Sequence, residues 1–225
     1  MCTTSAVDAE FFMAHLGNTI SVPASSTSNT KSRKYKVQSN ITTPADGAVC
    51  GFLGGTNTPP IFVRQGFKVV IGFSLGDSTT NAQTRTMIGL FQSTTVPVLN
   101  SSTTVASATT QSIGIVQEAG ENVWSFNTRG SASATKVATT ISCQTPSLTW
   151  YILEIVNVVN SNVISMKLAN QDATSATQLF TCGTTATMSN TALNFIQLQR
   201  NMSSFSGLAG SAILQTASFR LWNSV

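Results

Sequence analysis

Charged side chains are scarce in this sequence, which has 9% of them against about 25% in an average soluble protein. Serine, threonine, asparagine and glutamine take their place in long runs such as 25–30, 77–86 and 100–112. Hydroxyl side chains compete for backbone hydrogen bonds and therefore favour strands and turns over helices. At 41% hydrophobic residues, the chain also has material for a packed core. The composition predicts an all-β protein with a neutral, hydrogen-bonding surface.

The net charge of +4 is concentrated in one short segment rather than spread over the chain. Lys31, Arg33, Lys34 and Lys36 supply four of the twelve basic residues, and without them the formal charge falls from +4 to zero. Four charges neutralise few phosphates, so we do not expect a nucleic-acid partner. A small coat protein that contacts packaged nucleic acid through this segment is the alternative that the segment leaves open.

The sequence also has only one histidine, and its cysteines are not clustered. Cys2, Cys50, Cys143 and Cys182 lie far apart without a C-x-x-C pair, and His15 is the single histidine. A zinc site needs clustered ligands, and a catalytic triad needs a placed histidine. There is no glycine loop with a following lysine for phosphate and no calcium-loop pattern. We therefore expect no metal, no cofactor and no enzymatic activity.

The sequence contains one pair of closely spaced acids, and paired carboxyl groups can cleave glycosidic bonds. Glu118 and Glu121 flank a turn between two predicted strands. We expect both to be solvated at a hairpin tip, where a general acid would not be tuned for catalysis. A glycan-cleaving spike would need carboxylates that the sequence does not visibly pair.

Targeting signals are not apparent either. The first eight residues contain neither a basic nor an apolar stretch typical of a signal peptide, and no run reaches 18 uncharged apolar residues. We expect no membrane partner and expect the protein to be assembled in the cytoplasm of a cell.

The N-terminal segment differs from the rest of the chain. Residues 5–16 combine a capping Ser5, early acids and apolar residues at helical spacing, and Gly17 follows. This pattern predicts a short helix with Phe11, Phe12 and Leu16 on an apolar face that contacts another subunit or a docking partner. The segment from Thr19 to Lys34 resembles a linker with at most one short strand. We therefore divide the chain into an arm, 1–34, and a β domain, 35–225.

From residue 35 onward, short apolar runs alternate with turn signals and predict about ten to twelve strands. We expect 67–75 to pair with 84–92, and hairpins at 118–121 and at 160–162. Such spacing favours an antiparallel two-sheet β-sandwich of the jelly-roll or concanavalin-like kind. The predicted strands are 49–53, 67–75, 84–92, 112–117, 122–127, 135–141, 150–159, 163–169, 193–199 and 212–222.

An ordered set of motifs runs through residues 66–225. These motifs are Gly66-Phe67 with Phe73, Ile88-Gly89-Leu90-Phe91-Gln92-Ser93-Thr94, Ile113-Gly114-Ile115, Asn127 to Lys136-Val137, and Trp150-Tyr151-Ile152-Leu153-Glu154-Ile155. In order and spacing they resemble the C-terminal β-sandwich modules of tailed-phage fibre and virion structural proteins, which also occur in larger DNA viruses. The resemblance implies a lectin-like, concanavalin-type sandwich at the tip of a homotrimeric fibre.

Two groups of residues are candidates for ligand binding. The polar loops 76–84 and 127–135 carry Asp77, Asn81, Asn127 and Arg129, which suit glycan hydroxyl groups. Trp124, Trp150 and Trp222 have the chemistry to stack on sugars, but each lies in an apolar run, so we predict that they belong to the core.

Two hypotheses about function agree with these observations. The first is a tail-fibre head or receptor-binding module of a virion, which attaches as a homotrimer to a host surface glycan or receptor. The alternative is a capsid decoration or minor capsid protein that contacts only other virion proteins.

Overall fold

The computed structural model describes residues 13–16, 19–21, 37–41, 49–54, 61–75, 84–92, 111–118, 121–129, 134–142, 149–172, 178–188, 195–202 and 212–223. These residues form fourteen strands and no helix. The strands are β1 (Met13–Leu16), β2 (Thr19–Ser21), β3 (Val37–Ile41), β4 (Val49–Gly54), β5 (Phe67–Leu75), β6 (Thr84–Phe91), β7 (Ser112–Gln117), β8 (Val123–Arg129), β9 (Ala134–Ser142), β10 (Thr149–Asn157), β11 (Val163–Asp172), β12 (Gln178–Thr187), β13 (Phe195–Met202) and β14 (Ala212–Asn223).

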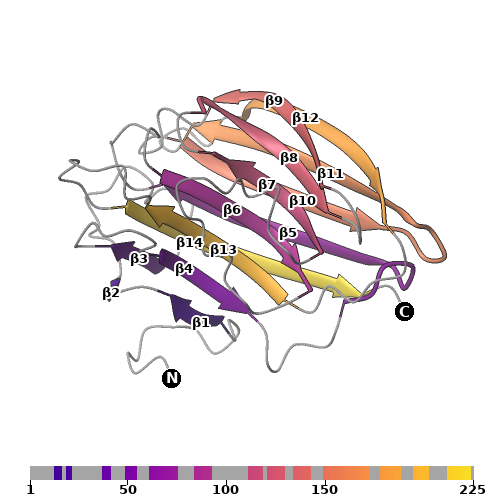
Figure 1. Ribbon diagram of the computed structural model, residues 1–225, viewed down its shortest axis with the longest axis horizontal. Helices are drawn as coiled ribbons and strands as arrows, with labels where there is room; N and C mark the ends of the chain where they lie inside the picture. The colour runs from indigo at the N-terminus through magenta and orange to yellow at the C-terminus, as the bar shows by residue number, and fades with distance from the viewer. Residues whose placement is uncertain are drawn as a thin grey trace.

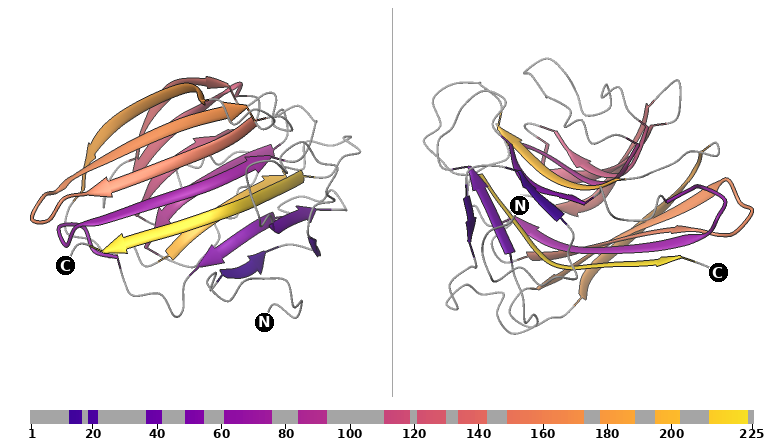
Figure 2. Two further views of the ribbon diagram at one scale, coloured as in Figure 1. Left: turned by 180° about the vertical axis from the view of Figure 1, so that it is seen from behind. Right: turned by 90° about the horizontal axis from the view of Figure 1, so that it is seen from below.

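The strands assemble into two antiparallel sheets that pack face to face (Figure 1). Sheet A has the order β1-β4-β13-β6-β7-β8-β9, and sheet B has the order β12-β11-β10-β5-β14-β3-β2. The predicted all-β, two-sheet antiparallel sandwich is thereby confirmed. Figure 2 shows, from below, that sheet A is curved and that its outer face is concave, whereas sheet B is flatter.

The predicted N-terminal helix is wrong for its last four residues. Met13–Leu16 is strand β1, which pairs with β4 at one edge of sheet A, and Leu16 and His15 lie on it. Helical propensity is a weak preference, and pairing with β4 satisfies the backbone groups of both strands. Residues 5–12, with Phe11 and Phe12, lie outside the described residues, so the docking role of this segment stays a prediction. The division at residue 34 also stays a prediction.

The predicted pairing of β5 with β6 is also wrong. β5 pairs with β10 and β14 in sheet B, whereas β6 pairs with β13 and β7 in sheet A. The chain therefore crosses from one sheet to the other between these two strands. Strand β12 was not predicted from the sequence, because its threonine-rich sequence lacks a clear apolar alternation.

The core lies between the sheets and follows from the two-residue period of the strands. In β5 every second residue from Phe67 to Phe73 is buried, and Tyr151, Leu153 and Ile155 of the neighbouring strand β10 lie beside them on the same side of sheet B. At the centre, the rings of Phe73 and Tyr151 are stacked with centroids 5.2 Å apart. Trp124 meets both rings edge-on, at 5.6 Å and 5.4 Å.

The predicted assignment of the tryptophans to the core is confirmed for Trp124 and Trp150, which are 0% and 1% exposed. The side chain of Trp222 lies outside those that the structure describes.

The predicted hairpin at 160–162 joins β10 and β11 as expected. Asn160 has a positive φ of 60°, a conformation that asparagine tolerates better than most residues. The turn is fixed from within by the side chain of the buried Asn157. Its amide nitrogen donates to the carbonyl oxygens of Ser161 at 2.8 Å and Val163 at 3.0 Å. Its amide oxygen accepts a hydrogen bond from the backbone N–H of Arg64 at 2.7 Å.

Candidate functional site: the concave face of sheet A

The concave face of sheet A carries a lateral row of four residues that come from four adjacent strands. Gly89 of β6 lies opposite Gly114 of β7, Gly114 lies opposite Asn127 of β8, and Asn127 lies opposite Lys136 of β9. Their neighbours in sequence, such as Ile88, Ile113 and Phe126, belong to the core between the sheets. Because side chains alternate along a strand, the row faces the other way, onto the concave face.

The two glycines form the floor of this face. A Cβ atom added to Gly89 would lie 2.1 Å from the carbonyl oxygen of Ile113, and one added to Gly114 would lie 2.1 Å from that of Ile88. The two backbones approach one another so closely that no side chain fits on either strand here. Glycine inside a strand often marks such an approach, or a place where a ligand comes close to the backbone.

Asn127 stands beside this glycine floor with an amide oxygen that lacks a partner. The residue is 2% exposed, and Oδ1 has no hydrogen-bond partner among the residues that the structure describes. More than nine in ten buried polar groups in proteins have such a partner, so each exception calls for an explanation. An acceptor in this position is suited to receive a hydrogen bond from a hydroxyl or amide group.

The surroundings of Asn127 are polar on one side and apolar on the other. Buried Ser125 and half-buried Arg129 lie two residues away on the same face of β8, and Ser112 lies opposite Arg129 on β7. Met87, Phe91 and Val116 form a separate apolar cluster on the same face of β6 and β7. These polar and apolar residues are buried: Met87, Phe91, Val116, Ser112, Ser125 and Asn127 are all 1–2% exposed.

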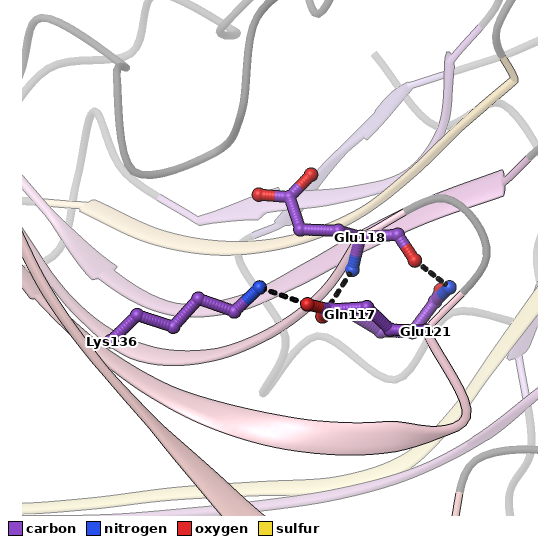
Figure 3. A network of polar contacts seen from close by, with 4 residues as sticks. All are labelled: Gln117, Glu118, Glu121 and Lys136. Atoms are coloured by element: carbon purple, nitrogen blue, oxygen red, sulfur yellow. Dashed lines mark hydrogen bonds and ion pairs between the residues drawn. The ribbon is translucent and has the colours of Figure 1, made fainter.

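An ion pair and a set of hydrogen bonds fix the border of this face, as Figure 3 shows. Lys136 forms an ion pair with Glu121 Oε1, and Glu121 Oε2 accepts a hydrogen bond from the backbone N–H of Glu118 at 3.1 Å. The side-chain amide of Gln117 donates to the carbonyl oxygen of Glu118. Thr86 in turn donates to Gln117 Oε1 at 3.3 Å. These contacts connect β6, the turn after β7, and β9, and so hold Lys136 in place.

The prediction that both acids at this turn are solvated is wrong for Glu118. Its residue exposure is 7%, whereas the side chain of Glu121 is 34% exposed and bound to Lys136. The two acids are joined by two hydrogen bonds, from the backbone N–H of Glu118 to Glu121 Oε2 at 3.1 Å and from the backbone N–H of Glu121 to the carbonyl oxygen of Glu118 at 3.0 Å. The residues 118–121 predict a hairpin, but such a pattern does not determine which side chains of the turn are buried.

The structure brings together two of the four predicted ligand-binding residues. Asn127 and Arg129 lie on the concave face, whereas Asp77 and Asn81 lie outside the described residues. Gly89, Gly114 and Lys136 were not predicted from the sequence as parts of a site. They were nevertheless within the motifs that carry the resemblance, and their register across four strands is what unites them.

The described residues contain no group of three or more histidine, cysteine, aspartate or glutamate side chains that could hold a metal ion. Nor is there, in this part of the chain, a helix that is long and apolar enough to cross a membrane.

No protein-family model matches the sequence, and no curated protein matches it. Solved structures with a similar fold do exist. Arcelin-5, a lectin-like defence protein from Phaseolus vulgaris, is 10% identical, with 95% of this chain and 93% of that chain covered and a TM-score of 0.54. The exoplasmic/lumenal domain of VIP36, in a Ca²⁺/Man3GlcNAc-bound form, is also 10% identical, with coverage of 95% and 84% and a TM-score of 0.54.

A structure of botulinum neurotoxin type C, whose cell entry depends on two ganglioside molecules, is 8% identical with a TM-score of 0.52. It matches 94% of this chain, but this chain spans only 43% of that structure. At such identities the likeness concerns the fold, and the fold of this chain is therefore the lectin-like β-sandwich.

Proposed function

We propose that the chain is a receptor-binding module of a virion, in the manner of a tail-fibre head, and that it attaches to a host surface glycan. The motifs of residues 66–225 and the lectin-like sandwich support this proposal. A surface poor in charge and rich in hydroxyl and amide groups also suits contact with neutral glycans outside a cell. In this proposal the module is not an enzyme, and it acts within the virion after assembly in the host cytoplasm.

The observation that carries the proposal is the buried amide oxygen of Asn127 above the glycine floor. In this proposal a hydroxyl group of the glycan donates to this oxygen, which is buried without a partner among the described residues. The apolar cluster of Met87, Phe91 and Val116, which is 1–2% exposed, lies on the same face. Pockets that bind small ligands typically combine such an apolar lining with a few convergent polar groups.

Homotrimeric assembly and contacts with other virion proteins belong to the same proposal. A single sugar contact is weak, and three linked sites raise the overall affinity by about 10²- to 10⁴-fold without any new contact. The N-terminal segment with Phe11, Phe12 and Leu16 would supply the contact with neighbouring subunits or with the fibre shaft.

A glycan array tests the concave face directly. The protein is applied in wild-type form and as Asn127→Leu, which removes the amide but keeps a similar volume. We expect the wild type to bind a defined set of glycans and the variant to lose at least tenfold in signal. The matched control is Asn162→Leu, the same change at an exposed asparagine of the β10–β11 turn, and it should bind like the wild type.

The proposal fails if the wild type binds no glycan, or if Asn127→Leu and Asn162→Leu bind equally well. A chain that ignores glycans but binds empty capsids would be a decoration protein instead.

A further inference from the structure

At one end of the sandwich the edge strand β9 of sheet A and the edge strand β12 of sheet B lie next to one another (Figure 1). Val137 of β9 is in register with Phe126 of β8 and therefore lies on the core side of sheet A. It is nevertheless 45% exposed, and β9 is the edge strand of sheet A. Below it lies a cleft of about 250 Å³ between the sheets.

The lining of this cleft differs from the rest of the interior. Phe126 and Met166, which are 3% and 1% exposed, belong to the buried core and lie at its base. Nearer the surface, threonines occupy the core-facing positions that large apolar residues occupy at the base. We name the site the threonine cleft; its lining is Phe126, Thr128, Thr135, Val137, Met166, Thr184, Thr185, Ala186 and Thr187.

The chemistry of the lining restricts the ligand. None of the nine lining residues is ionisable, so a charged ligand would lose its hydration without gaining a counter-charge. A purely aliphatic ligand would bury threonine hydroxyls without partners, which costs about 1–3 kcal/mol for each. The ligand therefore has to be neutral, with an apolar face and a rim of groups that both donate and accept hydrogen bonds.

The size of the cleft further restricts which ligands can bind. Pockets for drug-sized molecules measure about 300–1,000 Å³, so this cleft suits a single ring rather than a chain of rings. A pyranose ring has C–H groups on its faces for Phe126 and Met166. Its rim of hydroxyls matches the hydroxyls of Thr128, Thr135 and Thr184 on the core-facing side, each of which donates and accepts.

We propose that the threonine cleft binds one neutral pyranose unit, at a site separate from the concave face. The cleft opens between the two sheets at the β9–β12 end, whereas Asn127 points away from the core on the outer side of sheet A. The cleft site therefore does not rest on the glycan site proposed above, and each of the two can be removed without the other.

Saturation-transfer NMR tests the proposal in the full chain. The probes are the methyl glycosides of glucose, galactose, mannose and N-acetylglucosamine, with N-acetylneuraminic acid as the charged comparison. Each is measured with the wild type and with Asn127→Leu, in which the concave face is disabled. We expect at least one neutral glycoside to receive saturation from both proteins, and the charged sugar to receive none from Asn127→Leu.

Two further variants, each made in the Asn127→Leu background, place the signal in the cleft. Ala186→Leu fills the cleft, and the pair Thr135→Val with Thr184→Val removes two hydroxyls while it keeps their shape. Both should reduce the signal at least tenfold, whereas Val158→Leu, at an exposed position of the β10–β11 turn, should leave it unchanged. Should Ala186→Leu fail to fold, the threonine pair decides alone.

Three results would overturn the cleft proposal. The first is that none of the four neutral glycosides gives a saturation-transfer signal. The second is that the signal disappears in Asn127→Leu, in which the cleft is intact. The third is that the signal persists in the cleft variants. None of these results would contradict a glycan-array signal that depends on Asn127, so the two proposals can be rejected independently.

Discussion

Two buried asparagines of this protein have contrasting environments. Asn157 is 2% exposed, and its side chain makes three hydrogen bonds with Arg64, Ser161 and Val163. Asn127 is equally buried, but its Oδ1 has no partner in the described part of the chain. A buried amide with all its partners contributes to stability, whereas one with an unmatched oxygen lowers it. The first belongs to the scaffold and the second to the site.

This contrast predicts opposite effects of substitution on the free energy of unfolding. Asn157→Ala leaves the N–H of Arg64 and two carbonyl oxygens without partners, so we expect a loss of about 3 kcal/mol. Asn127→Leu should change stability by about 1 kcal/mol or less, since it removes an amide whose oxygen is already unmatched. Urea unfolding followed by tryptophan fluorescence measures both. Equal losses in the two variants would contradict the assignment of Asn127 to a binding site.

The sequence indicates the chemistry of a side chain but not the direction in which it points. Asn127 and Arg129 were predicted as ligand-binding residues, and both lie on the concave face, because a strand carries alternate residues on one face. Glu118 was expected in solvent and is buried. Which way a side chain beside a turn points depends on the backbone conformation there, which a pattern of residue types does not specify.

At the level of elements, β6 and β7 depend on a pair of facing glycines. A Cβ atom at Gly114 would lie 2.1 Å from the carbonyl oxygen of Ile88, a rigid backbone atom that cannot move without disturbing the pairing of the two strands. Gly183 of β12 offers a comparison, since a Cβ there would lie 3.1 Å from the carbonyl oxygen of Met166.

We therefore expect Gly114→Ala to lower the free energy of unfolding by about 2 kcal/mol or more, through overpacking. Gly183→Ala should cost at least about 1 kcal/mol less, because the neighbouring atoms need to move only a little. Chemical denaturation of the two variants, compared with the wild type, gives these differences. A Gly114→Ala variant as stable as Gly183→Ala would mean that the strands do not approach so closely.

The positions of most strands followed from the sequence, but their partners did not. The runs 67–75 and 84–91 are strands as predicted, and the prediction that they pair was wrong because the chain changes sheets between them. Consecutive strands are neighbours in many β proteins, and this preference carries no information about a crossover. The predicted helix failed at 13–16 for a related reason, since the edge of β4 was available as a partner.

For the whole molecule, turn spacing and apolar alternation were sufficient to predict a two-sheet antiparallel sandwich. The curvature of sheet A and the cleft between β9 and β12 were not predictable, because they depend on how fourteen strands distribute over two sheets. Both features carry the proposed sites. The site residues come from separate motifs, and only the register across β6, β7, β8 and β9 places them in one row.

Homotrimeric assembly predicts a native mass of three chains in light scattering of the purified protein. It also predicts that binding to a glycan-coated surface exceeds binding to the soluble glycan by about 10²-fold or more, since the three sites act together. A monomer with equal affinity for the soluble and the immobilised glycan would contradict this prediction. The function would then be closer to that of a decoration protein.

A glycan bound on the concave face of sheet A against Asn127 would change the NMR resonances of this residue and of its neighbours. The glycan with the strongest array signal is added to ¹⁵N-labelled protein, and the side-chain amide of Asn127 and the backbone amides of Gly89, Gly114 and Ser125 are followed. We predict that the resonances of these four groups shift together and saturate at one dissociation constant. Shifts confined to other residues, such as those of the β10–β11 turn, or the absence of any shift would contradict glycan binding at Asn127.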